Sequence, residues 1–497
     1  MIESLADIVP TQAAEYPDAE AVRSGGASLT YAELDQRCSA LAVRLRDLGV
    51  RPGDRVGVWV HKSVESMAAV HAVLRLGAAY VPLDPAASAG VLARVLADAG
   101  VGVLVTNTRQ ARIAELMAEM PELHVLESSS VDDATLEQVP AQHVSPDAMA
   151  YLMYTSGSTG QPKGIVHTHA SALAYATRAS ELYGLRRDDL LANIAPLHFD
   201  QSTFELFSGP IAGAASLFVP EPYLRLPASL SQLVQDERPT VWYSVPSVLR
   251  MLVDRGALQE RDLSSLRWVL FGGEVYPPAA LAQLMQHCPK ARFSNVYGPA
   301  EVNQCTYHHL DSPPATDRAI PIGRAWDATE LAIDDGELLV RTDTVMAGYW
   351  QRPELTDAAF VVGPDGSKDW YATGDLVDRQ ADGELVFVGR RDNQVKVRGQ
   401  RVELEAVDAA LRALPGVEEG VGVVGEGPDG LPVVEGRVIL RPEITLSDEA
   451  SNLLAATLPS HAVPHRLVVV GSLPRTSNGK VDRVAAALEL EVNPCLS

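Results

Sequence analysis

The segment Tyr154-Thr-Ser-Gly-Ser-Thr-Gly-Gln-Pro-Lys-Gly164 concentrates the residue types that bind phosphate. Its glycines let backbone N–H groups come close to an anion, and its serine and threonine hydroxyls can donate to phosphate oxygens. The apolar run Met149-Ala-Tyr-Leu-Met153 comes directly before it and predicts a buried strand. The spacing differs from that of the common nucleotide-binding loop, because Gly-x-x-x-x-Gly-Lys-Ser/Thr is missing here. A flexible serine- and glycine-rich turn is the alternative for this segment taken alone.

Three later segments carry the ionisable groups that such phosphate chemistry would need. Asn295-Val-Tyr-Gly-Pro-Ala-Glu301 ends in a carboxylate, and Tyr371-Ala-Thr-Gly-Asp-Leu376 places Asp375 directly after a glycine. Leu473-Pro-Arg-Thr-Ser-Asn-Gly-Lys-Val-Asp-Arg483 places Lys480 after another glycine. Reactions at phosphorus use a metal held by carboxylates and a cation that meets the developing charge. Each segment by itself would be an ordinary turn, the last with a solvated lysine.

In this order the segments resemble the signatures of the adenylate-forming ligases, a superfamily of acyl-CoA synthetases, luciferases and the adenylation domains of nonribosomal peptide synthetases. The resemblance extends to Leu29-Thr-Tyr-Ala-Glu-Leu34, Gly336-Glu-Leu338, Ala347-Gly-Tyr-Trp350 and the hinge-like Gly389-Arg-Arg-Asp392, so that it covers the chain from about Leu29 to Arg483. Members of the superfamily hold the pyrophosphate of ATP in the serine-rich loop while a carboxylate attacks the α-phosphorus. The resemblance implies an enzyme that uses ATP and Mg²⁺ and has no tightly bound organic cofactor.

The resemblance also implies roles for single residues. Glu301 would bind Mg²⁺, Asp375 would accept both ribose hydroxyls, and Lys480 would bridge the acid carboxylate and the nucleotide. The implied catalytic residues are Lys480, Thr155, Glu301 and His198, whose ring would gate carboxylate entry. The implied ATP-binding residues are Thr155, Ser156, Gly157, Ser158, Thr159, Gly160, Lys163, Asn295, Tyr297, Gly298, Asp375 and Arg390. Ala300 replaces a threonine whose hydroxyl would contact the α-phosphate, a loss of roughly 1–2 kcal/mol that affects rate rather than mechanism.

Two segments favour an amino acid as the substrate acid. Leu76-Gly-Ala-Ala-Tyr-Val-Pro-Leu-Asp-Pro85 and Phe199-Asp-Gln-Ser202 resemble those of the amino-acid-activating branch. A buried carboxylate at Asp200 is costly without a cationic partner, and a substrate ammonium would be such a partner. The structural alternative for Asp200 is a helix N-cap.

Local alignment with the family gives a substrate pocket that is uncharged between its two ends. Asp200 and Lys480 would hold the amino and carboxylate ends of the substrate. A charged side chain would lie unpaired in the middle, so we expect a small or medium neutral amino acid: Ala, Val, Ile, Pro or a small hydroxyl-bearing analogue. A β-amino acid stays open, because a shifted ammonium could still reach Asp200. The pocket residues are Asp200, Gln201, Phe204, Tyr243, Leu270, Gly272, Val296, Gln304, Cys305 and Lys480.

The acceptor of the activated acid is inferred from the motifs that are missing beside these segments. The chain starts close to the first signature, stops soon after Lys480, and carries no condensation-type His-His-x-x-x-Asp-Gly or carrier-type Gly-x-Asp-Ser motif. We expect a stand-alone aminoacyl-[carrier protein] ligase of natural-product (antibiotic) biosynthesis that loads the phosphopantetheine thiol of a discrete carrier protein in trans. Gly399 resembles the glycine that lines the thiol tunnel in the family.

Three other functions stay open. An acyl- or aryl-CoA ligase, or a luciferase-like oxygenase, would use the same core but would not need Asp200. A non-catalytic binding homologue would be expected to lose Glu301, Asp375 or Lys480, and all three are present.

The elements that must position these residues alternate between strands and helices. Arg55-Val-Gly-Val-Trp-Val60 precedes a helical stretch over about 64–76, and Val101-Gly-Val-Leu-Val-Thr106 precedes one around 111–120, which is typical of βαβ units with parallel sheets. From about 330 to 387, Asp-Gly pairs separate short strands and predict hairpins in a small antiparallel barrel.

We therefore predict an α/β fold with two domains. A large N-terminal core domain over 1–391 would combine parallel-type sheets, flanking helices and the small β-barrel subdomain, and would hold the ATP and amino acid sites. A smaller, mobile α+β domain over 392–497 would carry the lysine, with the hinge at Asp392.

Composition narrows the class of protein further. The 497 residues are 46% hydrophobic and 21% charged, as in a soluble globular protein, and the formal net charge of −23 argues against a nucleic-acid partner. No apolar run is long enough to span a bilayer, and the acidic N-terminus lacks a signal-peptide pattern. The four cysteines lack metal-ligand or disulfide spacing. We predict a reduced, cytoplasmic protein without a membrane partner.

Overall fold

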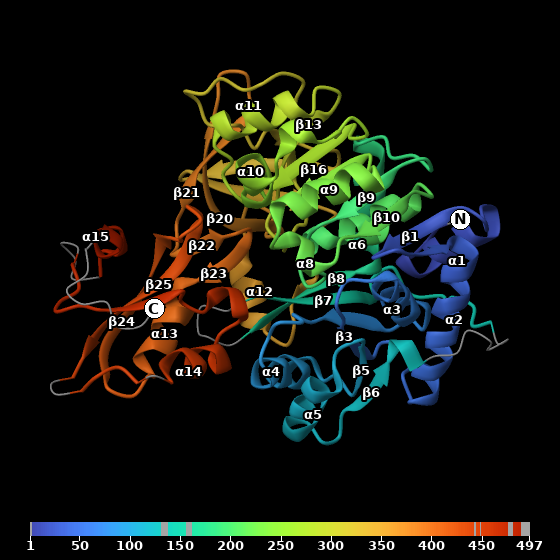
Figure 1. The fold of residues 1–497 in the computed structure, drawn as a ribbon, viewed down its shortest axis with the longest axis horizontal. Helices are drawn as coiled ribbons and strands as arrows, with labels where there is room; N and C mark the ends of the chain where they lie inside the picture. The colour runs from blue at the N-terminus through green and yellow to red at the C-terminus, as the bar shows by residue number, and fades with distance from the viewer. Residues whose placement is uncertain are drawn as a thin grey trace. The chain divides into compact units, whose positions relative to one another are not determined.

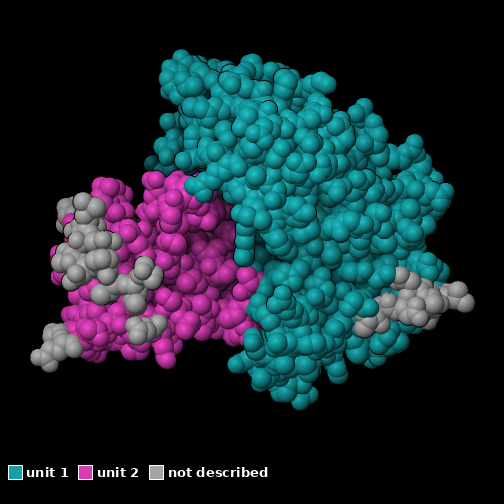
Figure 2. Space-filling model, viewed as in Figure 1, with its two compact units in different colours: residues 1–85, 96–153, 164–391 teal, residues 86–95, 154–163, 392–497 magenta. Residues whose placement is uncertain are grey.

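Alternating apolar strands and helices build two large sheets in the first part of the chain (Figure 1). The computed structural model describes residues 2–130, 138–155, 162–441, 444–447, 449–475 and 481–488. The chain divides into two compact units, coloured separately in Figure 2. Unit 1 comprises 1–85, 96–153 and 164–391, and unit 2 comprises 86–95, 154–163 and 392–497. The division into domains at residue 392 stays a prediction.

The first sheet of unit 1 has nine strands in the order β15-β14-β13-β12-β11-β9-β10-β1-β2. Strands from β13 to β1 pair in parallel, whereas β14, β15 and β2 pair antiparallel at the two edges. The strands are β1 (Glu20–Ser24), β2 (Ala27–Thr30), β9 (Leu190–Asn193), β10 (Ala215–Phe218), β11 (Val241–Ser244), β12 (Trp268–Gly272), β13 (Arg292–Tyr297), β14 (Thr306–Leu310) and β15 (Arg324–Ala325).

The second sheet has seven strands in the order β18-β8-β7-β4-β3-β5-β6. The ladders β7–β4, β4–β3, β3–β5 and β5–β6 are parallel, which confirms the predicted parallel α/β arrangement. The strands are β3 (Arg55–Trp59), β4 (Ala79–Pro82), β5 (Val103–Thr106), β6 (His124–Glu127), β7 (Met149–Thr155), β8 (Lys163–Thr168) and β18 (Gly348–Tyr349).

Helices connect these strands and close the core. The Leu29–Leu34 signature forms a capping box at the start of α2, in which Thr30 Oγ1 accepts from the Glu33 amide at 3.2 Å and Glu33 Oε2 accepts from the Thr30 amide at 2.8 Å. The helices are α1 (Ile8–Glu15), α2 (Tyr31–Asp47), α3 (Val64–Arg75), α4 (Ala89–Ala99), α5 (Gln110–Glu119), α6 (His169–Leu182), α7 (Gly209–Ile211), α8 (Glu221–Leu224), α9 (Pro227–Glu237), α10 (Pro246–Arg255), α11 (Pro278–His287) and α12 (Pro353–Ala359).

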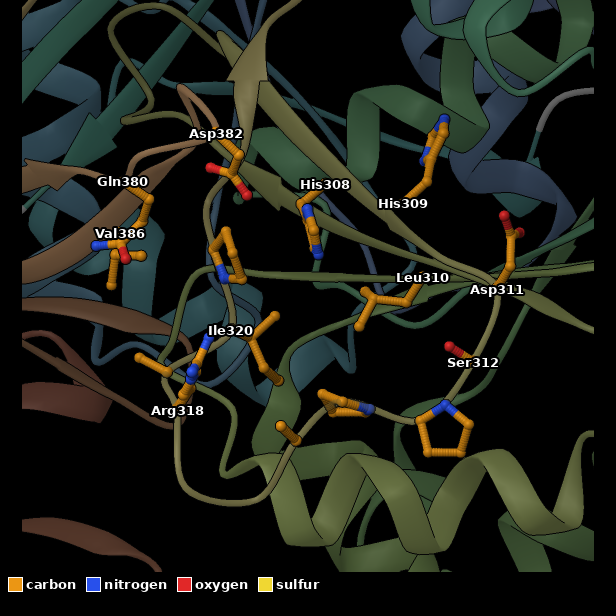
Figure 3. Close-up of a pocket in the computed structure, with 15 residues that line it drawn as sticks. His308, His309, Leu310, Asp311, Ser312, Arg318, Ile320, Gln380, Asp382 and Val386 are labelled. Atoms are coloured by element: carbon orange, nitrogen blue, oxygen red, sulfur yellow. The ribbon is translucent and has the colours of Figure 1, made fainter.

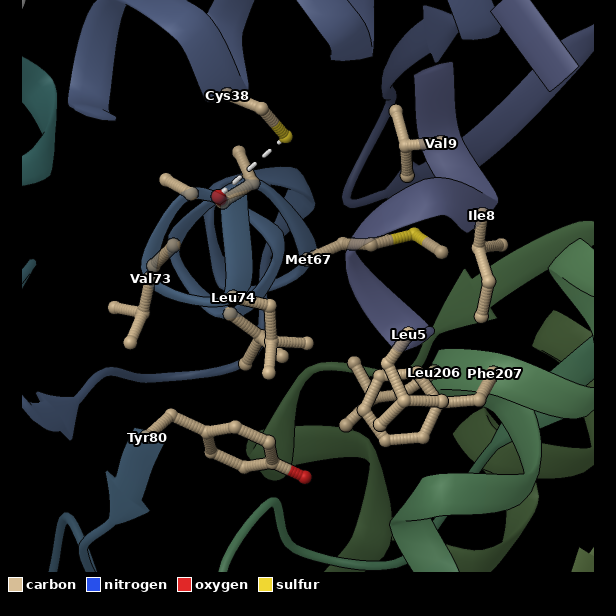
Figure 4. Close-up of a cluster of buried hydrophobic side chains, with 14 of the residues drawn as sticks. Leu5, Ile8, Val9, Cys38, Met67, Val73, Leu74, Tyr80, Leu206 and Phe207 are labelled. Atoms are coloured by element: carbon tan, nitrogen blue, oxygen red, sulfur yellow. Dashed lines mark hydrogen bonds between the residues drawn. The ribbon is translucent and has the colours of Figure 1, made fainter. Parts of the chain in front are cut away.

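The main hydrophobic core of unit 1 joins side chains from both sheets and from α1, α2, α3 and α6. Figure 4 shows part of it, where Met67 of α3 lies among Ile8, Leu74 and Phe207. Cys38 belongs to this core, and its thiol donates to the Ala68 carbonyl at 3.6 Å. Burial raises the pKa of Cys38 to about 12, so this thiol is an inert packing group.

A smaller antiparallel sheet follows in unit 1, in the order β16-β17-β20-β19, with β21 on β20. Its strands are β16 (Thr329–Asp334), β17 (Glu337–Thr342), β19 (Phe360–Val361), β20 (Trp370–Arg379) and β21 (Leu385–Arg390). Asp335-Gly336, Asp365-Gly366 and Asp382-Gly383 each lie between two antiparallel strands, as predicted. The ladders run in an open path rather than around a closed barrel.

Unit 2 contains a three-stranded sheet and a separate hairpin. The sheet has the order β24 (Val417–Glu426), β25 (Pro432–Leu440), β26 (Arg466–Val469), and the hairpin joins β22 (Gln394–Val397) and β23 (Gln400–Glu403). Its helices beyond residue 392 are α13 (Leu404–Arg412), α14 (Ala450–Thr457) and α15 (Arg483–Leu488). Among the described residues, no helix has the length and apolar composition needed to cross a bilayer.

Candidate functional site

The predicted substrate residues gather at one edge of the nine-stranded sheet. Tyr243 lies near the carboxyl end of β11, Val296 near that of β13, and Gly272 at that of β12, with Leu270 two residues before Gly272. Because these strands run in parallel, their carboxyl ends meet at the same edge, where open α/β sheets bind ligands. Asp200 follows β9 and completes the same edge.

Asp200 opens a short 3-10 turn, η3 (Asp200–Ser202), whose N-cap position belongs to Phe199. One carboxylate oxygen, Oδ1, accepts from the amide of Gln201 at 2.9 Å. The ring hydroxyls of Tyr151, Tyr175 and Tyr243 are also close to this charge: burial raises the pKa of each, and the negative charge of Asp200 adds to the rise. Buried phenol groups therefore form part of the surroundings of this carboxylate.

Aromatic rings form one wall next to Asp200. Phe204 packs edge-on against Tyr243 with 5.5 Å between ring centroids and against Tyr183 at 5.9 Å. Tyr183 also accepts from the Gln304 amide at 3.3 Å, and burial raises its pKa to about 12. These rings fix one another, so the wall is rigid as well as apolar.

Two glycines in this region are required by close backbone approach. A Cβ atom on Gly272 would lie 2.2 Å from the carbonyl oxygen of Val296, its register partner on β13. A Cβ atom on Gly298 would lie 2.0 Å from the carbonyl oxygen of Asn303. Nearby, Cys305 is fully buried and its thiol donates to the Tyr297 carbonyl at 3.5 Å. Asn295 donates to the Pro321 carbonyl at 2.7 Å, which ties β13 to the loop between β14 and β15.

Asp375 lies at the centre of a second cluster. It pairs across the antiparallel ladder with Arg390, whose guanidinium donates to Asp375 Oδ1, and Tyr297 donates its hydroxyl to Asp375 Oδ2 at 2.5 Å. Asp375 is 3% exposed. Each carboxylate oxygen has two lone pairs, so both oxygens can accept one further hydrogen bond from a diol.

Glu301 is fully buried, and one oxygen, Oε1, accepts from the Tyr349 hydroxyl at 2.7 Å. His167 is a close neighbour: its Nε2–H donates to the Ala300 carbonyl at 2.9 Å. Burial lowers the pKa of His167 to about 4, although the Ala300 bond and the Glu301 charge oppose this, so the ring is neutral. A buried carboxylate is a hard oxygen donor of the kind Mg²⁺ takes, and Glu301 fits the metal role in its chemistry.

The start of the phosphate loop is described only in part. Thr155 ends β7, and its hydroxyl is buried without a hydrogen bond to any described residue. Lys163 begins β8, with its Nζ 4.0 Å from Glu403 Oε1. The predicted residues Ser156, Gly157, Ser158, Thr159, Gly160 and Lys480 lie outside the described residues.

The predicted gate, hinge and tunnel residues lie on three separate segments. His198 packs against Phe199 with 4.8 Å between ring centroids, and its Nδ1 is buried without a hydrogen bond to any described group. Asp392 Oδ1 accepts from the Gln394 amide at 3.2 Å, next to the break between the two compact units. Gly399 lies in the turn between β22 and β23.

Sequence reasoning missed several residues that the fold brings to these clusters. Tyr349, which donates to Glu301, belongs to the segment Ala347-Gly-Tyr-Trp350, which resembles the family without an assigned role. The hydroxyl-bearing tyrosine in that segment was a signal for such a contact. Thr373 supports Asp375 by accepting from its amide at 3.0 Å. Tyr151 and Tyr175 near Asp200 carry no distinguishing sequence pattern.

A model of the family described as AMP-binding enzyme matches residues 9–350, which is more than half of the chain. The chain belongs to this family. The predicted relation to the adenylate-forming ligases is confirmed.

Two relatives match this enzyme over nearly its whole length. It is 36% identical over 502 residues to the L-proline--[L-prolyl-carrier protein] ligase of Pseudomonas fluorescens, which covers 96% of this chain and 97% of that protein. It is 35% identical over 512 residues to the protein of the same description from Streptomyces coelicolor, covering 95% and 94%. The solved structure of the amide bond synthetase McbA from Marinactinospora thermotolerans superposes with a TM-score of 0.86 at 27% identity, over 97% of this chain and 99% of that one.

The enzyme also has a groove of about 550 Å³ that none of the predicted site residues lines. Figure 3 shows its lining, which includes His308, Arg318 and Asp382. His308 Nδ1 lies 2.5 Å from Glu384 Oε2, and His309 is held by Ser294 at 3.1 Å. Both histidines are thus held by other side chains of unit 1.

Proposed function

We propose that this enzyme activates L-proline as prolyl-AMP, with release of pyrophosphate, and then transfers the prolyl group to the phosphopantetheine thiol of a separate carrier protein. The observation that carries this proposal is the placement of Asp200 at the edge of the nine-stranded sheet beside the buried hydroxyls of Tyr151, Tyr175 and Tyr243. Two full-length relatives described as L-proline--[L-prolyl-carrier protein] ligases support the same amino acid and the same kind of acceptor.

Proline suits the pocket for physical reasons. Its secondary ammonium has two N–H donors for the single carboxylate of Asp200, and its ring is compact and apolar. The aromatic wall of Phe204, Tyr243 and Tyr183 excludes water from that ring and offers no partner to a charged side chain. Alanine, valine and isoleucine also combine an ammonium with an uncharged side chain, but their side chains would fill the space beside the aromatic wall differently.

The proposed first step joins two substrates held by different clusters. Asp375, with Tyr297 and Arg390 as its partners, would accept the ribose hydroxyls of ATP, and Thr155 would donate to a phosphate. Glu301 would hold Mg²⁺, which neutralises phosphate charge when bound. An oxygen of the amino acid carboxylate then bonds to the α-phosphorus while the bond to pyrophosphate breaks, with Lys480 proposed to meet the developing charge.

The proposed second step transfers the prolyl group to sulfur. A thiolate of the carrier arm attacks the prolyl carbonyl, and AMP leaves. The carrier is the proposed partner in trans, and the cytoplasm is the proposed compartment because it keeps such a thiol reduced.

Exchange of labelled pyrophosphate into ATP tests the first step. We expect L-proline to give the largest amino-acid-dependent exchange in a panel of α- and β-amino acids, with D-proline and cyclopentanecarboxylic acid as matched controls for chirality and for the ammonium. A β-amino acid as the best substrate would favour the β-specific alternative. Exchange with aryl or fatty acids and none with amino acids would contradict the proposal.

Mass spectrometry of the acceptor tests the second step. A holo carrier protein should gain the mass of a prolyl group, whereas free coenzyme A and the apo carrier should not. Faster loading of coenzyme A than of any carrier would identify a CoA ligase, and capture by free amines alone would identify an amide synthetase.

A further inference from the structure

Lys62 is a buried cation that none of the motifs includes. It lies between β3 and α3 and is 5% exposed. Its Nζ donates to the carbonyl oxygens of Asn193 at 3.2 Å and Ile194 at 2.7 Å. Lys62 therefore ties the end of β3, in the seven-stranded sheet, to the end of β9, in the nine-stranded sheet.

Acidic groups surround this cation. The Lys62 amide donates to Glu221 Oε1 at 3.1 Å, and Glu205, which is 1% exposed, accepts from the Asn193 side-chain amide at 2.9 Å. Burial lowers the pKa of Lys62 to about 8, while the negative charge of Glu221 opposes the fall. The ammonium is therefore still mostly protonated at neutral pH and makes charge-assisted bonds to both carbonyls.

The strand end that Lys62 holds leads directly into the amino acid site. His198 and Asp200 follow Ile194 within six residues. The charged groups that face His198 are Asp84, Lys62 and Glu221; burial is the largest cause that lowers the pKa of His198, and Lys62 lowers it further.

We propose that Lys62 is a positioning residue for amino acid activation, because it fixes the backbone of the segment that presents His198 and Asp200 to the substrate. The inference rests on the proposed function. Since Tyr297, Asp375 and Arg390 form their cluster on other strands, loss of Lys62 should disturb the amino acid site and leave the ATP site intact.

Steady-state pyrophosphate exchange with Lys62→Met and Lys62→Gln tests this inference. Met fills the space but donates nothing, whereas Gln keeps an N–H donor without the charge. We expect Lys62→Met to lower kcat/KM for the amino acid about 10- to 100-fold, the effect of losing one or two charge-assisted hydrogen bonds. The KM for ATP should change less than about twofold, and Lys62→Gln should recover part of the loss.

The pH profile separates positioning from general destabilisation. Removing the Lys62 charge leaves Asp84 and Glu221 to act on His198, so its pKa should rise and the acidic limb of kcat/KM should move to higher pH in both variants. Lys368→Met is the control, because Lys368 lies in the loop before β20, pairs with Asp357 of α12, and its side chain is 50% exposed.

Three outcomes would overturn the inference. They are equal losses for the amino acid and ATP together with a lowered Tm, an unchanged kcat/KM for the amino acid in Lys62→Met or Lys62→Gln, or a pH profile that stays in place. If Lys62→Met does not fold, Lys62→Gln alone decides. An absence of amino-acid-dependent exchange in the parent enzyme would instead contradict the proposed function itself, and the inference with it.

Discussion

Asp200 combines a structural contact with a proposed binding role. Its Oδ1 accepts one hydrogen bond from the amide of Gln201. The N-cap position of the turn belongs to Phe199, however, so the predicted role of Asp200 as a helix cap explains only this one contact of the carboxylate. A carboxylate among buried tyrosines gains most from a substrate cation.

Asp200→Ala should therefore cost about 3–5 kcal/mol with the amino acid, or on the order of 10²–10³ in kcat/KM, because the substrate ammonium would be left unpaired. The deaminated acid should change little. The measurement is pyrophosphate exchange with both acids, for the parent and the variant, together with a melting curve. Equal losses with both acids and a lower Tm would show that Asp200 is structural.

Glu205 gives a pH-dependent prediction at the same scale. Burial raises its pKa to about 8, against the opposing effects of the Asn193 bond and the Lys62 charge. The folded protein keeps a proton that the unfolded chain releases above pH 4.5, so this group stabilises the fold at low pH and the stability is lost as the pH rises through about 8.

Glu205→Gln removes this titration and keeps an acceptor for Asn193. We expect the difference in Tm between the variant and the parent to shift in favour of the variant as the pH rises from about 5 to 8. The shift should correspond to a few kcal/mol of stability at most. Thermal melting at several pH values checks this. A constant difference between the two proteins over that range would contradict the raised pKa.

At the scale of elements, the β22–β23 hairpin gives Gly399 a second reason to be glycine. Arg398 and Gly399 form its two-residue turn with φ of 53° and 77°, a geometry that Gly and Asn adopt most readily. A large side chain would strain this turn whether or not a thiol passes beside it. A test of the proposed tunnel must therefore preserve the turn.

Gly399→Asn meets that condition, since Asn tolerates positive φ and still adds a side chain. We expect adenylation to stay within about twofold of the parent while carrier loading falls at least about tenfold, which corresponds to some 1.4 kcal/mol. Pyrophosphate exchange and mass spectrometry of the carrier measure the two steps. Normal loading by the variant would leave Gly399 with the turn as its only role.

At the scale of the whole molecule, the chain separates into two compact units, and the proposed residues are divided between them. Asp375, Tyr297, Glu301 and Asp200 belong to unit 1, whereas Asp392 and Gly399 belong to unit 2. The family resemblance implies that Lys480, which lies outside the described residues, acts only in the first half-reaction.

Lys480→Ala should therefore lower adenylate formation at least about 10²-fold, because a cation at the developing charge is lost. Transfer to the carrier from preformed prolyl-AMP should remain largely intact. Pyrophosphate exchange measures the first step, and single-turnover loading from the synthetic adenylate measures the second. Equal losses in both would remove Lys480 from its proposed first-step role.

The sequence by itself determined the family, the α/β fold and several local structures. Capping boxes and Asp-Gly turns depend on neighbours within a few residues, so Thr30 with Glu33, and the hairpin at Asp335-Gly336, could be predicted from local pattern. The motifs could be recognised because each keeps its chemically required residues in one contiguous segment.

Only the tertiary structure decided which of these segments contact one another. Tyr297 meets Asp375 across 78 positions of sequence, Tyr349 meets Glu301 across 48, and Lys62 meets Asn193 across 131. No periodicity links such partners, because strand order in a sheet does not follow chain order. Lys62 reads in the sequence as a surface lysine before a helix, and only the fold, which brings the segment after β3 to the end of β9, makes it a buried donor.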